Sequence, residues 1–269
     1  MNKELLKKIF LPLIVLVIII QVWSGVAAFI SGFPTPSDTF VYAFGGTTSS
    51  GDELKGVLSD PFYVENQDDK GIFWQLVESL KRVFAGFFLA VVVGVPIGLM
   101  VGMSKNIHYA LDPFIQILKP VSPLAWLPLL LFAFKDIDNT AISTIFVTSI
   151  WPIIINTSLG VKNVSEDYLN VAKVLRFTSL EKVFKIILPV AVPYIFAGMR
   201  LSLGIAWLVI VAAEMLTGGI GIGFWIWNEY NSLSYHNIII GIIIVGLVGF
   251  ILDILMGKIA DYFDYRKRV

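Results

Sequence analysis

Long apolar stretches alternate with short charged segments along the chain. Crossing the roughly 30 Å hydrocarbon core of a bilayer takes about 20 mostly apolar residues in a helix that rises about 1.5 Å per residue. Six stretches meet this requirement, at residues 9–30, 83–103, 113–134, 140–159, 190–216 and 238–257. The pattern predicts an all-α integral membrane protein with about six transmembrane helices.

The first stretch has a second interpretation as a cleavable signal peptide, because Lys3, Lys7 and Lys8 precede it and small residues end it. Its apolar run is longer than the roughly 7–15 residues of a signal sequence. We therefore expect it to be retained as a membrane helix.

Two stretches carry small or helix-weakening residues in a pattern. Four glycines of the second stretch recur at multiples of four residues and share one face: Gly86, Gly94, Gly98 and Gly102. Small residues at this spacing allow neighbouring helices to approach closely in lipid. The third stretch holds prolines at positions 113, 120, 123 and 128, which free backbone carbonyls where the helix faces protein or a water-filled path.

Basic residues set the expected orientation, because short cytoplasmic loops are enriched in Lys and Arg. With the N-terminus inside, the inner segments hold most of the lysines and arginines, so both termini are expected in the cytoplasm. The expected organisation is an N-terminal membrane helix over 1–32, an outer loop over 33–70, a core of five membrane helices over 71–257 and a cytoplasmic tail over 258–269.

A second outer segment, residues 217–236, joins four glycines to Phe224, Trp225, Trp227 and Tyr230. Aromatic residues at this density are typical of a membrane–water boundary or of a lined pathway. The glycines do not predict a phosphate-binding loop, because no Lys-Ser or Lys-Thr pair follows them. No Walker-type motif occurs elsewhere in the sequence, so any ATP must be bound by another chain.

The composition agrees with a membrane protein. Hydrophobic residues make up 57 % and charged residues 15 % of the 269 residues, against about 45–50 % and about 25 % in soluble domains. The 20 basic and 20 acidic residues cancel, which argues against a nucleic-acid-binding surface. With no cysteine and two histidines, at positions 108 and 236, neither thiol chemistry nor a metal site is expected.

The cytoplasmic segment over residues 160–189 mixes charged residues with apolar positions at helical spacing. A break is expected at Phe177-Thr178-Ser179, with Ser179 capping a second helix. The segment is either an interfacial helix that lies on the membrane or a docking helix for a cytoplasmic partner.

A resemblance favours the docking helix. The run Asn170-Val171-Ala172-Lys173-Val174-Leu175-Arg176 is followed, after nine residues, by Ile186-Ile187-Leu188-Pro189. This resembles the EAA loop of ABC importer permeases, in which Glu-Ala-Ala, three residues and Gly precede nine residues and Ile-x-Leu-Pro. Asn170 stands where that family has Glu and Arg176 where it has Gly, whereas Ala172 and the Ile-x-Leu-Pro end match.

Further stretches are similar to the nitrate/sulfonate/taurine branch of these permeases and, within it, to the nitrate type. The stretches similar to the branch as a whole lie at residues 79–86, 201–207 and 211–216, and those similar to the nitrate type lie at residues 69–72, 148–157, 171–176 and 219–228. The resemblance covers about residues 60–257, most of the chain.

The resemblance implies a type I ABC importer permease of the cell inner membrane, with the MetI-like fold and a cytoplasmic coupling helix. It implies a permease homodimer, an external substrate-binding protein and cytoplasmic ATPase subunits that carry ATP and Mg²⁺, with no cofactor bound by this chain. The residues expected to couple to the ATPase are Asn170, Val171, Ala172, Lys173, Val174, Leu175 and Arg176. The implied cargo is a small anion, with nitrate or nitrite first and sulfonate, taurine, bicarbonate and cyanate as alternatives.

Ionisable, amide and aromatic side chains inside the expected helices are candidates for the translocation path: Lys119, Trp126, Trp151, Asn156, Arg200, Trp207 and Glu214. Lys119 either reaches the cytoplasmic interface or contacts cargo, and the aromatic residues either pack between helices or line the path. Arg200 either clamps two helices or guides an anion, and Glu214 forms a structural or gating hydrogen bond. Arg200 and Glu214 lie about 21 Å apart along one helix, too far to pair with each other.

Three other functions fit parts of the sequence. An ion-coupled secondary transporter would need paired repeats and midplane carboxylates, and a membrane enzyme would need a Ser/His, HExxH or paired-aspartate arrangement; the sequence shows neither set of features. A non-transporting scaffold leaves the proline-rich stretch and the aromatic segment unexplained. We therefore expect a transporter subunit and not an enzyme.

Overall fold

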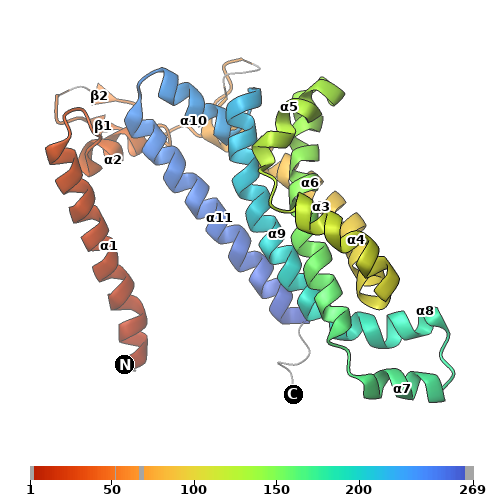
Figure 1. The fold of residues 1–269 in the computed structure, drawn as a ribbon. Coiled ribbons are helices and arrows are strands. Elements are labelled where there is room, and N and C mark those ends of the chain that lie inside the picture. Colours follow the sequence, from red (N-terminus) through yellow and green to blue (C-terminus); the bar gives the residue numbers. More distant parts are fainter. Residues whose placement is uncertain (1–2, 52, 67–69, 264–269) are drawn as a thin grey trace. The chain divides into compact units, whose positions relative to one another are not determined.

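The computed structural model describes residues 3–51, 53–66 and 70–263 and is largely helical (Figure 1). Residues 52, 67–69 and 264–269, which belong to the expected outer loop and cytoplasmic tail, lie outside this description. The helices are α1 (Lys3–Phe29), α2 (Pro36–Phe44), α3 (Ile72–Met103), α4 (Lys105–Leu118), α5 (Pro123–Phe134), α6 (Ile137–Lys162), α7 (Glu166–Val174), α8 (Ser179–Lys182), α9 (Leu188–Thr217), α10 (Ile222–Asn231) and α11 (Tyr235–Phe263). A π-helical turn, Val183–Ile187, joins α8 to α9, and β1 (Gly46–Thr47) pairs antiparallel with β2 (Glu53–Leu54).

The chain divides into two compact units, with boundaries after Gln75, Phe224 and Val245. The first unit contains α1, α2, the two strands, most of α10 and the first part of α11. The second unit contains most of α3, all of α4 to α9 and the end of α11. This division differs from the boundaries at residues 32, 70 and 257 expected from the sequence, which remain a prediction.

Five helical segments are long and apolar enough to cross a membrane: Phe10–Phe29, Ile72–Met103, Ile137–Lys162, Ser179–Thr217 and Tyr235–Phe263. The bent pair of α4 and α5 adds a sixth if it is taken as one span. The prediction of about six membrane helices is confirmed. Several of these helices extend beyond their apolar stretches, because their polar end turns remain helical.

The third apolar stretch is not the continuous helix that was expected. α4 ends at Leu118 and α5 begins at Pro123, and the two helices are bent by 97° relative to each other. Pro120 lies in the connection and has no N–H, so a helical hydrogen bond is lost where the chain turns. Pro123 then takes the first helical position of α5, where its fixed φ suits a helix start.

In the second unit, α6 packs against both α3 and α9. A methyl group added at Gly86, Gly94, Gly98 or Gly102 of α3 would lie 2.5–3.1 Å from an atom of α6. The glycine face predicted from the four-residue spacing is therefore the face that packs. On the other side of α6, the Ser202 hydroxyl of α9 donates to the Ser149 carbonyl at 2.7 Å.

In the first unit, the expected solvated loop over 33–70 contains ordered structure. Thr35 caps α2, because its hydroxyl accepts a hydrogen bond from the Asp38 N–H at 3.1 Å. The Asp38 carboxylate accepts hydrogen bonds from the Ser49 N–H at 3.0 Å and the Ser49 hydroxyl at 2.8 Å. These bonds favour the ionised carboxylate and lower the pKa of Asp38. α2 was not predicted from the sequence, because its helix signal is a single Thr35-Pro36 cap.

Candidate functional site

A hollow of 600 Å³ lies in the second unit, lined by residues of α5, α6, α9 and the connection before α5. Four of the seven candidates for the translocation path line it: Lys119, Trp126, Trp151 and Asn156. Its volume falls within the roughly 300–1,000 Å³ of small-molecule sites. The structure therefore brings together side chains from two separate apolar stretches of the sequence.

The break between α4 and α5 forms one wall of this hollow, because residues 119–123 all line it. Irregular backbone at membrane depth is tolerated where it is buried in protein or lines a water-filled cavity. Lys119 is the C-cap residue of α4, so the end of that helix fixes its position. Among the described residues that line the hollow, Lys119 is the one ionisable side chain, and its charge suits an anion.

A second wall of the hollow comes from α6 and includes another helix irregularity. Pro152 lies inside α6 and lacks an N–H, so one helical hydrogen bond is lost there. The Asn156 side-chain amide donates to the Pro152 carbonyl at 2.8 Å, which holds the amide against this turn. Two weakened helix segments therefore border one hollow.

Arg200 and Asp253 form a bidentate ion pair between α9 and α11. Nε and Nη2 of Arg200 lie 2.6 Å and 2.5 Å from the two carboxylate oxygens of Asp253. The side chains are 48 % and 51 % exposed, and neither is among the described residues that line the 600 Å³ hollow. The geometry favours the helix clamp over the anion guide, and it confirms that Arg200 does not pair with Glu214.

Glu214 lies at the centre of a buried network and is 0 % exposed. Its carboxylate accepts hydrogen bonds from the Ser79 hydroxyl at 2.8 and 2.9 Å and from the Gly223 N–H at 3.0 Å. Arg82 Nη1 lies 2.8 Å from the same carboxylate, and Arg82 Nε donates to Asp138 at 2.7 Å. Glu214 thus ties α9 to α3 and to the first turn of α10, as a structural hydrogen bond would.

Sequence reasoning did not single out Ser79, Arg82 and Asp138. A lone carboxylate inside a membrane helix needs a partner, and the Lys81-Arg82 pair at the start of another apolar stretch was the available signal. The choice between the two cations required the structure, because Lys81 pairs with Glu78 at 2.7 Å.

Trp207 packs between helices and is not among the described residues that line the hollow. It is buried, and a methyl group added at Gly249 of α11 would lie 3.0 Å from its Cδ1 atom. Of the three candidate tryptophans, Trp126 and Trp151 thus remain at the hollow. Among the described residues, no group of three or more His, Asp or Glu side chains could hold a metal ion.

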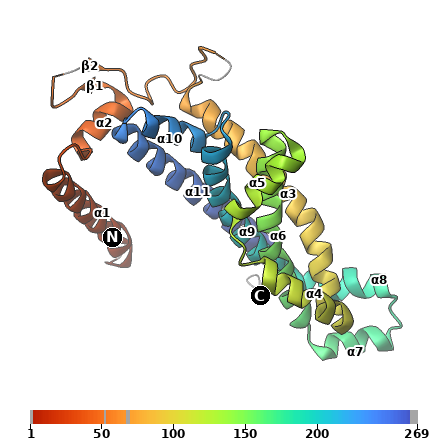
Figure 2. The same ribbon diagram turned by 45° about the horizontal axis from the view of Figure 1, so that its top comes forward.

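The expected coupling helix is α7, which lies with α8 at the end of the second unit where α6 ends and α9 begins (Figures 1 and 2). Val171, Val174 and Leu175 are exposed, Val174 by 82 %. Ala172 is 2 % exposed, so it packs within this chain and, contrary to expectation, offers no side chain to a partner. The remaining expected members, Asn170, Lys173 and Arg176, are exposed.

Arg176 turns the chain after α7 with a φ of +52°. Gly occupies this position in the EAA pattern, and Gly adopts such a backbone without steric cost. The chain therefore keeps the positive φ of this turn although Arg, unlike Gly, disfavours it. The second helix begins one residue earlier than expected, because Thr178 and not Ser179 is the N-cap and forms a capping box with Glu181.

Comparison with known families identifies the chain. Residues 94–269 match the family described as the binding-protein-dependent transport system inner membrane component. The chain belongs to this family. The permease is thus a multi-pass inner-membrane subunit of a transport system and not an enzyme.

Curated relatives of the permease carry transport names. It is 52 % identical over 205 residues to the nitrate import permease protein NrtB of Leptolyngbya laminosa, covering 76 % of this chain and 74 % of the relative. It is 48 % identical over 198 residues to the bicarbonate transport system permease protein CmpB of Synechocystis sp., covering 73 % and 71 %.

The fold of the permease also has a solved counterpart. The inward-facing MetNI methionine ABC transporter contains a chain that superposes with a TM-score of 0.62 at 15 % identity, over 71 % of this chain and 95 % of that chain. The likeness confirms the expected ABC transporter permease fold. The resemblance drawn from the EAA-like segment is therefore confirmed at the level of family and fold.

Proposed function

We propose that the permease forms the translocation path for a small oxyanion, nitrate first, in an ATP-driven importer. The observation that carries this proposal is the cationic hollow, in which Lys119 is the one ionisable side chain among the described lining residues. Ammonium groups and amide N–H groups are the donors that oxyanions accept from, and Asn156 adds an amide. The 52 % identity to a nitrate import permease supports nitrate as the anion.

The proposed assembly contains two copies of this chain, an external substrate-binding protein and cytoplasmic ATPase subunits that hold ATP and Mg²⁺. The family's dependence on a binding protein supports the external partner. The half-exposed Arg200–Asp253 pair supports the second copy, because charged side chains in membrane helices face protein or water and not lipid.

The proposed orientation places both termini in the cytoplasm. Cations gather where α3 meets α4 and where α6 leads to α9: Lys105 begins α4, Lys162 ends α6, and Lys173, Lys182 and Lys185 lie between α6 and α9. Short cytoplasmic loops are enriched in such residues. This orientation puts α7 and α8 on the side where ATP is available.

The proposed coupling surface consists of the exposed apolar side chains of α7 and the following turns: Val171, Val174, Leu175, Leu180 and Phe184. Lys173 and Arg176 lie beside them in the sequence and are exposed. A cytoplasmic ATPase with an apolar cleft and acidic rim would fit this surface. Ala172 supports the surface from within.

Bicarbonate is a second candidate, because the permease is 48 % identical to a bicarbonate transport permease. Both anions are planar, carry one negative charge and accept hydrogen bonds from the same donors. The hollow alone does not separate them, and in the proposed importer the external binding protein sets part of the selectivity.

Uptake of labelled nitrate at low concentration, in cells with and without the gene, tests the substrate. We expect loss of uptake in the deletion strain, recovery with the wild-type gene, and weak competition by taurine and bicarbonate. Unchanged nitrate uptake in the deletion strain would refute nitrate as the cargo. Loss of bicarbonate uptake in that strain would establish the second candidate instead.

Val174→Glu tests the coupling surface in the same strain. We expect this variant to reach the membrane at normal abundance but to lose both nitrate uptake and co-purification with the ATPase, because a charge replaces an exposed apolar contact. Val64→Glu is the matched control, since Val64 is also exposed but lies in the outer segment, and it should keep the ATPase bound. Normal co-purification by Val174→Glu would remove α7 from the interface.

A further inference from the structure

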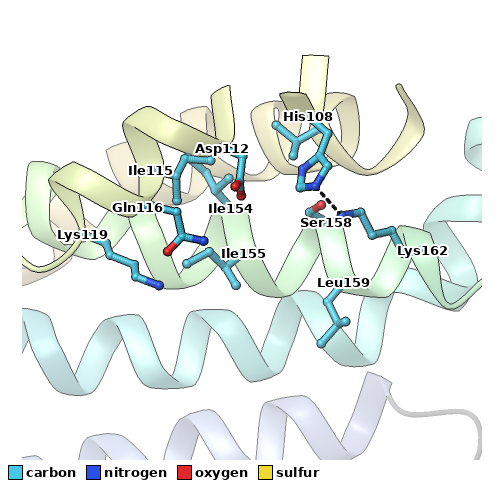
Figure 3. A pocket seen from close by; sticks show the side chains of 11 residues that line it. His108, Asp112, Ile115, Gln116, Lys119, Ile154, Ile155, Ser158, Leu159 and Lys162 are labelled. Atoms are coloured by element: carbon cyan, nitrogen blue, oxygen red, sulfur yellow. Dashed lines mark hydrogen bonds between the residues drawn. The ribbon is translucent and has the colours of Figure 1, made fainter. Parts of the chain in front are cut away.

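A smaller hollow of 210 Å³ lies between α4 and the second half of α6 (Figure 3). Figure 3 shows His108, Ser158 and Lys162 gathered at one end and Gln116 and Lys119 at the other, with Asp112 between them. A water takes roughly 30 Å³ of liquid volume, so the hollow has room for a small anion with several waters. Polar side chains from two helices thus face one space.

Hydrogen-bond donors outnumber acceptors at the His108 end of this hollow. Lys162 Nζ lies 3.2 Å from His108 Nε2. An ammonium group can only donate, so Nε2 accepts and the imidazole proton lies on Nδ1. Nδ1 is buried and has no hydrogen-bond partner among the described residues. An acceptor is therefore the group that this end lacks.

The charges along the smaller hollow favour an anion, but weakly. Lys119 and Lys162 contribute two positive charges and Asp112 one negative charge, while His108 is neutral in the tautomer just derived. No ion pair within 4.0 Å joins Asp112 to either lysine in the described part of the chain. The net charge of the lining is thus +1. So small an excess of positive charge favours brief rather than tight binding of an anion.

The two hollows are neighbours along α6. Lys119 and Ile155 line both of them. From there the lining of the smaller hollow continues to Ser158 and Lys162, towards the end of α6 that leads to α7. An anion that leaves Lys119 in the larger hollow therefore meets further donors in this direction.

We propose that the smaller hollow is a second, low-affinity oxyanion site, through which the anion passes from Lys119 to Lys162 on its way to the cytoplasm. This inference rests on the proposed function and adds to it a second anion-binding site on the cytoplasmic side of the path. Lys162 binds the anion, His108 positions the Lys162 ammonium through Nε2, and Asp112 limits the affinity. Successive weak sites of this kind allow an ion to enter and also to leave.

Binding of nitrogen-15 nitrate to the purified complete transporter, followed by line broadening in nucleotide-free nanodiscs, tests this site. Lys162→Gln should weaken nitrate binding roughly fivefold and Asp112→Asn should tighten it roughly fivefold, the factor expected for one unit charge at about 4 Å in aqueous surroundings. Lys185→Gln, which removes an exposed lysine outside the hollow, should leave the affinity unchanged.

Several outcomes would overturn the proposal. Equal nitrate affinity in wild type, Lys162→Gln and Asp112→Asn, all eluting as intact complexes, would show that the smaller hollow binds no anion. Nitrate binding that disappears when phosphatidylglycerol replaces phosphatidylcholine in the nanodisc would assign the site to an anionic lipid headgroup. Failure of the proposed function is a separate result, because it appears as intact nitrate uptake in the deletion strain.

Discussion

Arg82 places one guanidinium group between two carboxylates and a backbone carbonyl. Its Nε donates to Asp138, and its Nη1 donates to Glu214 and, at 2.6 Å, to the Ile220 carbonyl. Glu214 in turn leaves no space at Gly221, where a methyl group would overlap its carboxylate. One buried charge pair therefore sets the path of the glycine-rich loop before α10.

The pair should be strongly coupled energetically. Removing one partner of a buried ion pair costs about 3–5 kcal/mol, because the other charge stays buried and unpaired. We expect Arg82→Gln and Glu214→Gln each to lower the thermal stability of the purified permease, and the double variant to lose clearly less than the sum of both. Strictly additive losses would show that the two side chains act independently.

At the scale of the helices, the contact between α3 and α6 depends on missing side chains. Gly98 is one of the tight positions, since a methyl group there would lie 2.6 Å from the Thr157 Cβ and 2.9 Å from the Ile154 carbonyl oxygen. Backbone on one side and a branched side chain on the other leave little freedom to adjust. Close helix contact of this kind is a main source of stability within lipid.

Gly98→Ala should therefore destabilise the permease by about 1–3 kcal/mol, the usual cost of overpacking. Gly246→Ala is the matched control, because nothing lies within 4 Å of a methyl group added there. Within a helix that substitution is neutral or stabilising by up to about 1 kcal/mol. Thermal unfolding of both variants in the same detergent gives the comparison, and equal stability would contradict the packing argument.

The membrane helices were predictable from sequence, because apolar length and glycine spacing are local properties. The 97° bend between α4 and α5 was not, since prolines show where helical hydrogen bonds are lost but not where the next helix points. The pattern of α7 likewise did not reveal that Ala172 faces inward and Val174 outward, because nine residues make too few turns to define a buried face.

The site was predictable in part for the same reason. Lys119, Trp126, Trp151 and Asn156 stood out as polar or aromatic residues in apolar stretches, and they meet at one hollow. The ion pairs were beyond sequence reasoning, because their partners lie 53 and 132 residues apart and only the packed helices bring them together.

At the scale of the whole chain, the orientation in the membrane can be read out chemically. The sequence contains no cysteine, so a cysteine introduced at one position is the single labelling site. The distribution of lysine and arginine predicts that the segment over residues 33–70 lies outside and α8 inside.

Ser59→Cys should react with a membrane-impermeant maleimide on intact cells, and Ser179→Cys should react only after permeabilisation. Both serines are exposed, so accessibility within the protein does not limit the reaction. Gel shift of the labelled chain provides the measurement. The reverse pattern would invert the proposed topology and remove α7 from the cytoplasm.

The clamp between Arg200 and Asp253 also has a consequence for biogenesis. Arg200 lies near the middle of α9, and its partner is synthesised 53 residues later. At a translation rate of roughly 5–20 residues per second, Asp253 is added about 3–10 s after Arg200, and Arg200 lacks this partner in the interval. Arginine at a helix centre is among the least favourable residues for membrane insertion. α9 is therefore expected to remain beside the insertion machinery until α11 emerges, so that the two helices enter lipid as a pair.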